Sequence, residues 1–279
     1  MKTSLIITTF NWKEALDLVL RSVARQVELP DEIIIADDGS RPDTAELVQR
    51  WATRLPAPLI HVWQEDQGFR VGRARNLAIA AATGEYLVMI DGDMVLHSHF
   101  VLDHKRAARA GHFIQGVRLL TEPELGRRML AEGRLDLGIF SSGIKRRRHA
   151  LRSPLLSRVF RWCPPTSVSG IRSCNQGYWK ADLLRVNGFN EQMIGWGDED
   201  LEIVLRLFHL GVRRRNLRFG GLTIHLHHPS RESTGENPNR KILEATRSSR
   251  STWCAVGLDQ HLPGQPPVKR TADRRPELL

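Results

Sequence analysis

The sequence predicts an α/β fold with a mostly parallel central sheet, because short apolar strands alternate with amphipathic helical segments along residues 5–90. Polar clusters follow three of these strands, at residues 8–11, 37–40 and 91–93. In open parallel sheets, ligands bind beyond the carboxyl ends of the strands. The same alternation therefore predicts both the fold class and the sheet edge at which a binding site would lie.

The expected elements of the first half follow one another in a regular order. The predicted strands lie at 5–8, 32–36, 59–63 and 86–90, and the predicted helices at 13–27, 43–55 and 72–82. Pro30 follows the first helix and Thr83-Gly84 follows the third, and both are helix-ending signals. The succession of strand, helix and strand implies right-handed crossovers between parallel strands.

Two further elements are expected in the second half. A helix opens at residues 195–200 and runs to Gly211, which is a suitable residue just past a helix end. Residues 223–228 alternate like a strand, which would place His225 and His227 on one face and His228 at its end.

Composition indicates an ordered, cytoplasmic protein. Of the 279 residues 41% are hydrophobic, which is enough to fill a core and argues against bulk disorder. No apolar run is as long as a membrane span, and the first residues run straight into a strand, so neither a membrane anchor nor a signal peptide is expected. The three cysteines are unevenly spaced and indicate reduced thiols.

The formal charge is +10, and much of it falls in one segment. Between Leu137 and Ala181 there is no acidic residue but there are nine basic ones: Lys145, Arg146, Arg147, Arg148, Arg152, Arg158, Arg161, Arg172 and Lys180. Apolar residues interleave with them around residues 151–162, as in a helix that rests on an anionic membrane. A solvated basic surface explains the segment equally well, so the charge alone decides nothing.

The Asp91-Gly92-Asp93 sequence at the end of the fourth strand is a candidate cation site. No glycine-rich phosphate loop follows the first strand, so a phosphate-bearing ligand would need a cation instead. Carboxylate oxygens suit a hard divalent ion, and the central glycine allows close approach of a diphosphate. An ordinary polar turn is the alternative.

Several motifs together resemble family 2 glycosyltransferases of the GT-A fold. They are Ser4-Leu-Ile-Ile-Thr-Thr-Phe-Asn11, Ile35-Ala-Asp-Asp-Gly-Ser40, Gly68-Phe-Arg-Val-Gly-Arg-Ala-Arg-Asn76 and Met89-Ile-Asp-Gly-Asp93. Asn175-Gln-Gly-Tyr-Trp-Lys180, Asn187-Gly-Phe-Asn-Glu191 and Gly195-Trp-Gly-Asp-Glu-Asp200 resemble the C-terminal half of β-1,4-galactosyltransferases and bacterial chondroitin-type polymerases. The resemblance extends from residue 4 to about residue 245.

This resemblance implies a nucleotide-sugar donor site at the sheet edge. Thr8, Thr9 and Phe10 would frame the nucleotide, and Asp37 or Asp38 would bind its base. The nucleotide and diphosphate region would be lined by Phe69, Arg73, Arg75, Asn76, Asp91 and Gly92. Arginine forks and a helix N-terminus suit phosphate, although surface arginines and a capped turn are the alternatives. Asp43 comes one residue later than in the family pattern, which weakens any role for it.

The resemblance also implies a catalytic base, Asp200, which would take the proton of the acceptor hydroxyl. Glu199 would orient the acceptor or Trp196, while Trp196, Gly197 and Asn175 would bind the acceptor. A helix N-terminus is expected to keep the Asp200 carboxylate ionised. An acidic helix-capping run is the alternative. The galactosyltransferases carry an acidic residue directly after the base, where this chain has Leu201.

The expected metal ligands are Asp93, His228 and His225. Aligning Asn237-Pro238 with the family places His228 on its metal histidine, and His225 falls where the galactosyltransferases use methionine. Imidazole ligands favour Mn²⁺ over Mg²⁺, and Zn²⁺ is a less suitable third choice. A buried polar strand end is the alternative.

The function implied is metal-dependent, inverting transfer of a hexose or N-acetylhexosamine from a UDP-sugar to a glycan or lipid-linked acceptor in cell-surface polysaccharide or glycolipid synthesis. The expected organisation is a nucleotide-sugar-binding half (1–120), a basic connecting segment (121–164), an acceptor-binding and catalytic half (165–262) and a disordered tail (263–279). Peripheral contact with the inner face of a membrane is a further expectation, and nucleic acid is not an expected partner. The alternatives are a nucleotidyltransferase and a non-enzymatic basic protein that binds polyanions.

Overall fold

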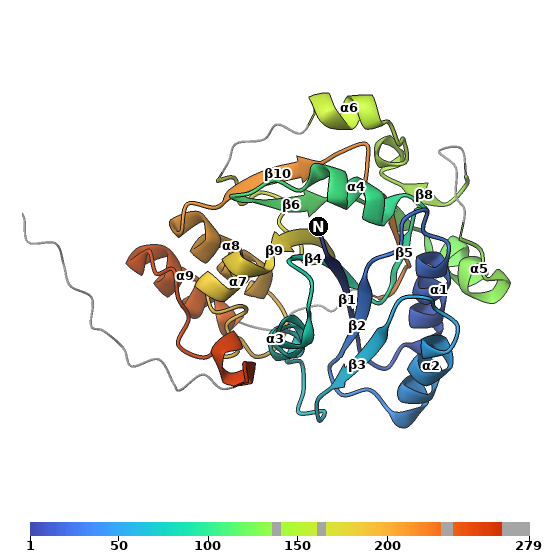
Figure 1. Ribbon diagram of the computed structural model, residues 1–279. Helices are drawn as coiled ribbons and strands as arrows, with labels where there is room; N and C mark the ends of the chain where they lie inside the picture. The colour runs from blue at the N-terminus through green and yellow to red at the C-terminus, as the bar shows by residue number, and fades with distance from the viewer. Residues whose placement is uncertain (136–140, 161–165, 230–236, 264–279) are drawn as a thin grey trace, which may run out of the picture.

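The computed structural model describes residues 1–135, 141–160, 166–229 and 237–263. Within these residues, seven strands form a central sheet in the order β10-β6-β9-β4-β1-β2-β3 (Figure 1). Their bounds are β1 (Thr3–Thr9), β2 (Glu32–Asp37), β3 (Leu59–Trp63), β4 (Tyr86–Asp91), β6 (His112–Gly116), β9 (Asn175–Trp179) and β10 (Arg213–Leu217). Only β9 runs antiparallel to its neighbours in this sheet, which confirms the expected mostly parallel α/β fold.

Helices cover both faces of this sheet because its central strands are apolar on both sides. On β1, Leu5 and Ile7 pack with one group of helices, whereas Ile6 packs with the other. The first group is α1 (Lys13–Ala24), α2 (Pro42–Ala52) and α4 (Phe100–Ala107). The second comprises α3 (Val71–Ala81), α7 (Lys180–Arg185) and α8 (Glu199–His209), with α9 (Asn239–Ser249) packed beside α8.

A smaller sheet stands beside the central one and joins distant parts of the chain. Its order is β5 (Met94–Leu96), β11 (Thr223–His225), β7 (Arg118–Thr121) and β8 (Ile144–Lys145). Helix α5 (Pro123–Glu132) and α1 pack against it through a third apolar cluster. Because β11 pairs with β5, His225 lies opposite Met94, the residue after Asp93.

The predicted order of elements holds, but several elements end earlier than expected, and the helix expected over 43–55 ends at Ala52. The first helix ends at Ala24 rather than at residue 27, and α8 ends at His209 with Gly211 at a φ of +90° just beyond its cap. The strand expected over 223–228 ends at His225. Beyond it the backbone N–H of Leu226 donates to the carbonyl of Asp93, and that of His227 donates to Thr121 Oγ1.

The segment expected to connect two halves carries short elements at the periphery. They are η1 (Arg147–His149) and α6 (Pro154–Val159), and a third short helix, η2 (Leu258–His261), lies near the end of the described chain. Residues 136–140 and 161–165 of the basic segment and 264–279 of the expected tail lie outside the described residues. Strands β9 and β10, from the C-terminal half, sit in the same sheet as β1 and β4. No helix among the described residues is long and apolar enough to span a membrane.

Candidate functional site

The carboxyl ends of β1 and β4 lie side by side and form the floor of the site. Thr8 Oγ1 donates to Asp91 Oδ1 at 2.9 Å, which joins the two strand ends. A Cβ on Gly92 would come within 2.7 Å of the Thr8 carbonyl oxygen. The turn after β4 can therefore approach β1 this closely only with glycine at its centre.

Three side chains meet directly after this turn and form a candidate metal centre. Asp93 Oδ2 lies 3.3 Å from His228 Nε2 and 3.4 Å from His225 Nε2. The candidate ligand atoms of the three residues all lie within 4.8 Å of one another. Asp93 Oδ1 is buried and has no hydrogen-bond partner among the described residues, so it has a free lone pair for a ligand. The set of two imidazoles and one carboxylate fits a transition-metal ion such as Mn²⁺.

The two histidines differ in their surroundings. The hydrogen bond to Asp93 raises the pKa of His228, while burial lowers that of His225. The other ring nitrogen of His228 faces the Pro229 carbonyl at 2.9 Å, an outer contact that orients a metal-ligating imidazole. His227 is exposed and is not part of the cluster.

Asp91 and Asp93 serve different partners, although both were expected at one cation. Asp91 forms an ion pair with Arg75, whose Nη2 lies 3.3 Å from Asp91 Oδ1. Asp93 alone joins the histidine cluster. The sharp turn at Gly92 separates the two carboxylates.

Arg75 is an interior residue and does not line an open donor pocket. Its side chain is 3% exposed and lies over the Phe189 ring at 5.2 Å. Besides Asp91, it contacts Glu199 Oε1 at 3.4 Å and donates to Ser173 Oγ at 2.9 Å. Arg75 therefore bridges the end of β4 and the start of α8.

Asp200 lies in the first turn of α8, beside this bridge. The backbone N–H of Ser173 donates to its Oδ2 at 3.3 Å. Burial, with a smaller contribution from the neighbouring Glu199 carboxylate, raises its pKa to about 7, and the charge of Arg75 only partly offsets this. The expectation that the helix N-terminus keeps Asp200 ionised is therefore wrong: burial outweighs it. A carboxyl group that titrates near neutral pH suits a general base.

The loop before α8 presents an aromatic side chain to solvent. Trp196 is 57% exposed, and the glycines on either side of it, Gly195 and Gly197, have φ of +86° and +109°. The loop backbone is tied down on both sides. The N–H of Gly195 donates to the Phe69 carbonyl at 3.0 Å, and Asn239 Nδ2 donates to the Gly197 carbonyl at 2.9 Å.

The two aspartates expected to bind a base already hold their own loop. Asp37 accepts from the Ser40 N–H and faces His61 Nε2 at 2.9 Å, and its side chain is 1% exposed. Asp38 accepts from the Arg70 N–H at 3.0 Å and from Gln64. Both carboxylates are buried and hold the loop that carries them, and the binding of a base by either stays a prediction.

The remaining nucleotide residues divide into exposed and buried positions. Thr8 and Thr9 are buried, whereas Phe10 is 39% exposed. Arg73 is 35% exposed, donates to Gln64 Oε1 at 2.8 Å and lies near Glu191. Phe69 is half-buried, and its carbonyl accepts from Gly195 in the loop that carries Trp196.

Two asparagines of the predicted site are buried and fully engaged. Asn76 exchanges hydrogen bonds with the backbone of Phe189 at 2.8 Å and donates to Glu191. Asn175 Oδ1 accepts from His104 Nε2 at 2.9 Å, and Asn175 Nδ2 donates to two backbone carbonyls. Both side chains are buried and used within the fold, so any part that Asn76 takes in nucleotide binding or Asn175 in acceptor binding stays a prediction.

Arg118, at the start of β7, was not among the site residues expected from the sequence. It lies near the metal centre, and its charge influences the protonation of both metal-centre histidines. No motif marks it, and it could have been found only from the pairing of β7 with β11.

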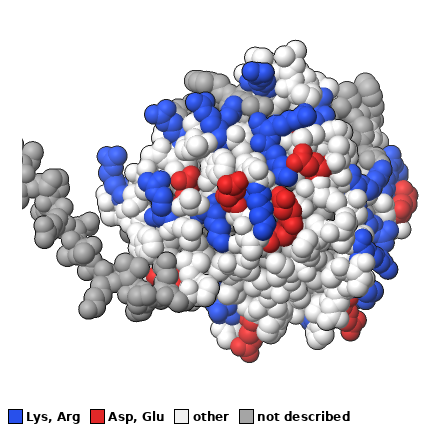
Figure 2. Space-filling model, viewed as in Figure 1, with Lys and Arg blue, Asp and Glu red and all other residues white. Residues whose placement is uncertain are grey.

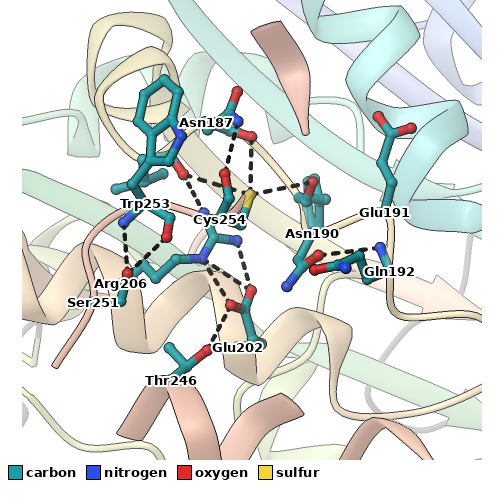
Figure 3. A network of polar contacts seen from close by, with 12 residues as sticks. Asn187, Asn190, Glu191, Gln192, Glu202, Arg206, Thr246, Ser251, Trp253 and Cys254 are labelled. Carbon is teal, nitrogen blue, oxygen red and sulfur yellow. Dashed lines mark hydrogen bonds and ion pairs between the residues drawn. The ribbon is translucent and has the colours of Figure 1, made fainter. Parts of the chain in front are cut away.

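Helix α8, which carries Glu199 and Asp200, contains a buried ion pair that joins it to neighbouring segments (Figure 3). Arg206 Nη2 lies 2.6 Å from Glu202 Oε2, and neither side chain is exposed. Arg206 also donates to the Val186 carbonyl, and Thr246 of α9 donates to Glu202 at 2.9 Å. The pair thereby ties α8 to the segment after α7 and to α9.

Breaking this pair should destabilise the protein strongly. Arg206→Met leaves the Glu202 carboxylate buried and unpaired, and the expected loss is about 3–5 kcal/mol of unfolding free energy. Urea unfolding followed by circular dichroism measures it. The double variant Glu202→Leu/Arg206→Met should recover a large part of the loss, because no lone charge remains. A single variant as stable as the parent would show that the pair does not anchor α8.

The chain matches two known families. Residues 4–164 match the family described as glycosyl transferase family 2, and residues 155–229 match the domain described as the N-terminal domain of galactosyltransferase. The chain is 30% identical over 277 residues to validoxylamine A glucosyltransferase of Streptomyces hygroscopicus subsp. jinggangensis, covering 92% of this chain and 60% of that protein. It is 28% identical over 267 residues to chondroitin synthase of Pasteurella multocida, covering 86% of this chain and 26% of that protein. It thus spans less than two thirds of the length of these relatives.

Solved structures share the fold. The Staphylococcus aureus TarS fragment 1–349 in complex with UDP has a TM-score of 0.56 at 18% identity, covering 82% of this chain and 61% of that one. The mannosyltransferase PcManGT of Pyrobaculum calidifontis, in complex with GDP-Man and Mn²⁺, has a TM-score of 0.54 at 18% identity, covering 89% and 62%. These likenesses confirm the GT-A fold.

Proposed function

Because the chain belongs to glycosyl transferase family 2, we propose that it transfers a hexose or N-acetylhexosamine from a UDP-sugar to an acceptor hydroxyl, with inversion and with a divalent metal. The observation that carries the proposal is the meeting of Asp93, His225 and His228 at the edge where the Asp200 turn of α8 is tied to Asp91 through Arg75. The family match favours this function over a nucleotidyltransferase or a non-enzymatic polyanion-binding protein.

In this proposal the Asp200 carboxylate accepts the proton of the acceptor hydroxyl as its oxygen attacks the anomeric carbon. Glu199 and Trp196 orient the acceptor, and the exposed Trp196 offers a flat apolar face to a sugar ring. Asp93, His225 and His228 would hold the cation, which would supply Lewis-acid stabilisation of the diphosphate. Attack opposite the leaving group inverts the anomeric centre.

The donor and acceptor classes rest on the relatives. One similar structure contains UDP, another contains GDP-Man with Mn²⁺, and the relatives include enzymes named for glucosyl transfer and for chondroitin synthesis. We therefore propose a glycan or lipid-linked acceptor in cell-surface polysaccharide or glycolipid synthesis, and Mn²⁺ before Mg²⁺ as the ion.

Donor hydrolysis in the presence of Mn²⁺ tests the proposal without knowledge of the acceptor. UDP-Gal, UDP-Glc, UDP-GalNAc and UDP-GlcNAc are incubated with the protein, and released UDP is measured. Slow hydrolysis of one donor, absent in Asp93→Ala, would identify the sugar. Indifference to all four donors and to UDP itself would contradict the proposal, and release of pyrophosphate would point to nucleotidyl transfer.

The rate of transfer should depend on pH through Asp200. Its raised pKa means that the carboxyl group takes up a proton already near pH 7, so kcat/KM should fall as the pH drops through about 7. An ordinary aspartate would lose activity only near pH 4. The charged and titratable neighbours of Asp200 are Glu199, Arg75 and Tyr178. Removing the repulsion in Glu199→Gln should move this acid limb to lower pH, and an unmoved limb would contradict the assignment.

We also propose that the face around α6 contacts an anionic membrane on its cytoplasmic side. Apolar side chains are exposed there: Leu155 is 73% exposed and Val159 is 64% exposed. Leu151 and Phe160 are also exposed. The exposed basic residues beside them are Lys145, Arg146, Arg147 and Arg158. Figure 2 shows basic side chains gathered along the upper part of the molecule, below the place where α6 stands in Figure 1. Protruding apolar groups ringed by positive charge match an anionic lipid surface.

Vesicle sedimentation tests this contact. The protein should pellet with vesicles that contain phosphatidylglycerol but not with pure phosphatidylcholine, and Leu155→Asp/Val159→Asp should abolish pelleting. Val27→Asp is a matched control, because Val27 is likewise 63% exposed but lies in the segment after α1, outside the α6 segment. Equal pelleting of the α6 variant and the control would refute the membrane proposal.

A further inference from the structure

Arg118 lies on the same side of the smaller sheet as a metal-centre histidine. In the parallel pairing of β7 with β11, Arg118 stands opposite Thr223 and Leu120 stands opposite His225. Side chains two residues apart on a strand share one face. The Arg118 and His225 side chains therefore project from the same face of the sheet. They lie on adjacent strands, offset by two residues in the register.

The guanidinium of Arg118 has few partners of its own. Its Nη1 donates to Cys174 Sγ at 3.3 Å, and its Nε is buried without a hydrogen-bond partner among the described residues. A thiol is a weak acceptor, so most of the donor capacity of this half-buried cation is unused. Cys174 directly precedes Asn175, which pairs with Ile90 of β4, so the guanidinium lies at the Asp91 end of that strand.

The surrounding charges agree with this position. Burial raises the pKa of Cys174 to about 12, and Arg118 opposes this effect while Asp91 and Asp93 add to it. The pKa of the Cys174 thiol is thus influenced by Arg118 and by both carboxylates of the turn after β4.

A fixed cation beside a metal-binding set is unfavourable by itself, because it repels the metal ion. The arrangement becomes favourable when an anion contacts both the ion and the guanidinium. Arginine binds phosphate oxygens through paired N–H groups, and it remains charged at every relevant pH. Arg75 cannot serve in this way, because Asp91 and Glu199 already neutralise it within the interior.

We infer that Arg118 is a binding residue for the diphosphate of the donor, which it contacts beside the cation held by Asp93, His225 and His228. The inference rests on the proposed function. It adds a positively charged side chain that contacts the diphosphate leaving group. It assigns the smaller sheet a direct part in donor binding.

The test compares two ligands, of which only one should bind more weakly when Arg118 is replaced. In Arg118→Gln, inorganic pyrophosphate in the presence of Mn²⁺ should bind about 10- to 100-fold more weakly, because a charge-assisted hydrogen bond is lost. Mn²⁺ alone should bind as tightly as in the parent or more tightly, because a repelling charge is removed. Arg118→Lys should retain part of the pyrophosphate affinity. Titration calorimetry measures all three, and thermal melting establishes that each variant is folded.

Arg127→Gln is the matched control, since Arg127 on the following helix is 74% exposed and pairs with Glu124 of the same helix. It should leave both affinities unchanged. Unaltered pyrophosphate binding in Arg118→Gln would overturn the inference, and so would a parallel loss of Mn²⁺ binding, which indicates a collapsed metal centre.

The same titrations separate this inference from the proposed function. If the parent protein binds Mn²⁺ and pyrophosphate but not UDP, the proposal of a UDP-sugar donor is wrong. The assignment of Arg118 to diphosphate binding would still hold. Binding of neither ligand would overturn both.

Discussion

Asp200→Asn should reduce sugar transfer by about 10²- to 10⁴-fold, the usual contribution of a general base. The amide keeps the shape of the carboxyl group and can still accept a hydrogen bond from the Ser173 backbone N–H. It cannot take a proton from the acceptor hydroxyl. Because Asp200 is separate from the cluster of Asp93, His225 and His228, donor and metal binding should survive.

Two measurements decide the role of Asp200. Transfer is followed as the release of UDP in the presence of acceptor, and donor affinity is measured by calorimetry with UDP and Mn²⁺. Asp182→Asn is a suitable control, because burial also raises the pKa of this carboxyl group but it lies in α7, away from the site. Equal losses of UDP affinity and of transfer in a folded Asp200→Asn would count against a base, and a control variant that loses as much would indicate a general effect of buried carboxyl groups.

The order of elements was predictable because hydrophobic periodicity is a local property of the chain. The runs that became β1, β2 and β4 are apolar on consecutive residues, and this pattern belongs to strands buried on both faces. The meeting of Asp93 with His228 is not local. It was predicted from a resemblance, and the structure brings the pair together through the antiparallel pairing of β11 with β5.

A motif identifies a side chain but does not show where its polar atoms are used. Asn76 and Asn175 are consumed by hydrogen bonds inside the fold, and Arg75 by two carboxylates. Burial of the first turn of α8 likewise reverses the effect expected for Asp200 at a helix N-terminus. Such desolvation depends on the packing of α8 against residues far away in the chain, which a local rule omits.

Arg118 shows the converse case, a charged residue without a motif. Nothing in the run Arg118–Thr121 distinguishes it from any short strand, and its importance arises only when β7 lies beside β11. The residues that hold an ion are recognisable by type, because few side chains ligate metals. The residues that complete its electrostatics are recognisable only by place.

Asp93→Ala should abolish Mn²⁺-dependent binding of UDP, an effect of at least about 100-fold, since losing even an outer contact of a metal ligand costs about 10- to 100-fold in affinity. Asp93 is the only carboxylate in the histidine cluster found among the described residues, so its loss leaves two imidazoles and no negative charge for the ion. Binding is measured by calorimetry with Mn²⁺ and with Mg²⁺, and Mn²⁺ should be the stronger ligand in the parent. Removal of metal by a chelator should reproduce the effect of the substitution.

The three histidines of residues 225–228 supply the internal control. His228→Ala removes a side chain that lies 3.3 Å from Asp93 and should weaken Mn²⁺ binding, whereas His227→Ala removes an exposed one outside the cluster and should not. The two variants are adjacent in the chain and alike in chemistry, so only the place of each ring distinguishes them. Equal loss in both would mean that the affinity reflects histidines in general and that the centre around Asp93 does not hold the ion. UDP binding that persists without metal in Asp93→Ala would mean that the nucleotide is held by other side chains altogether.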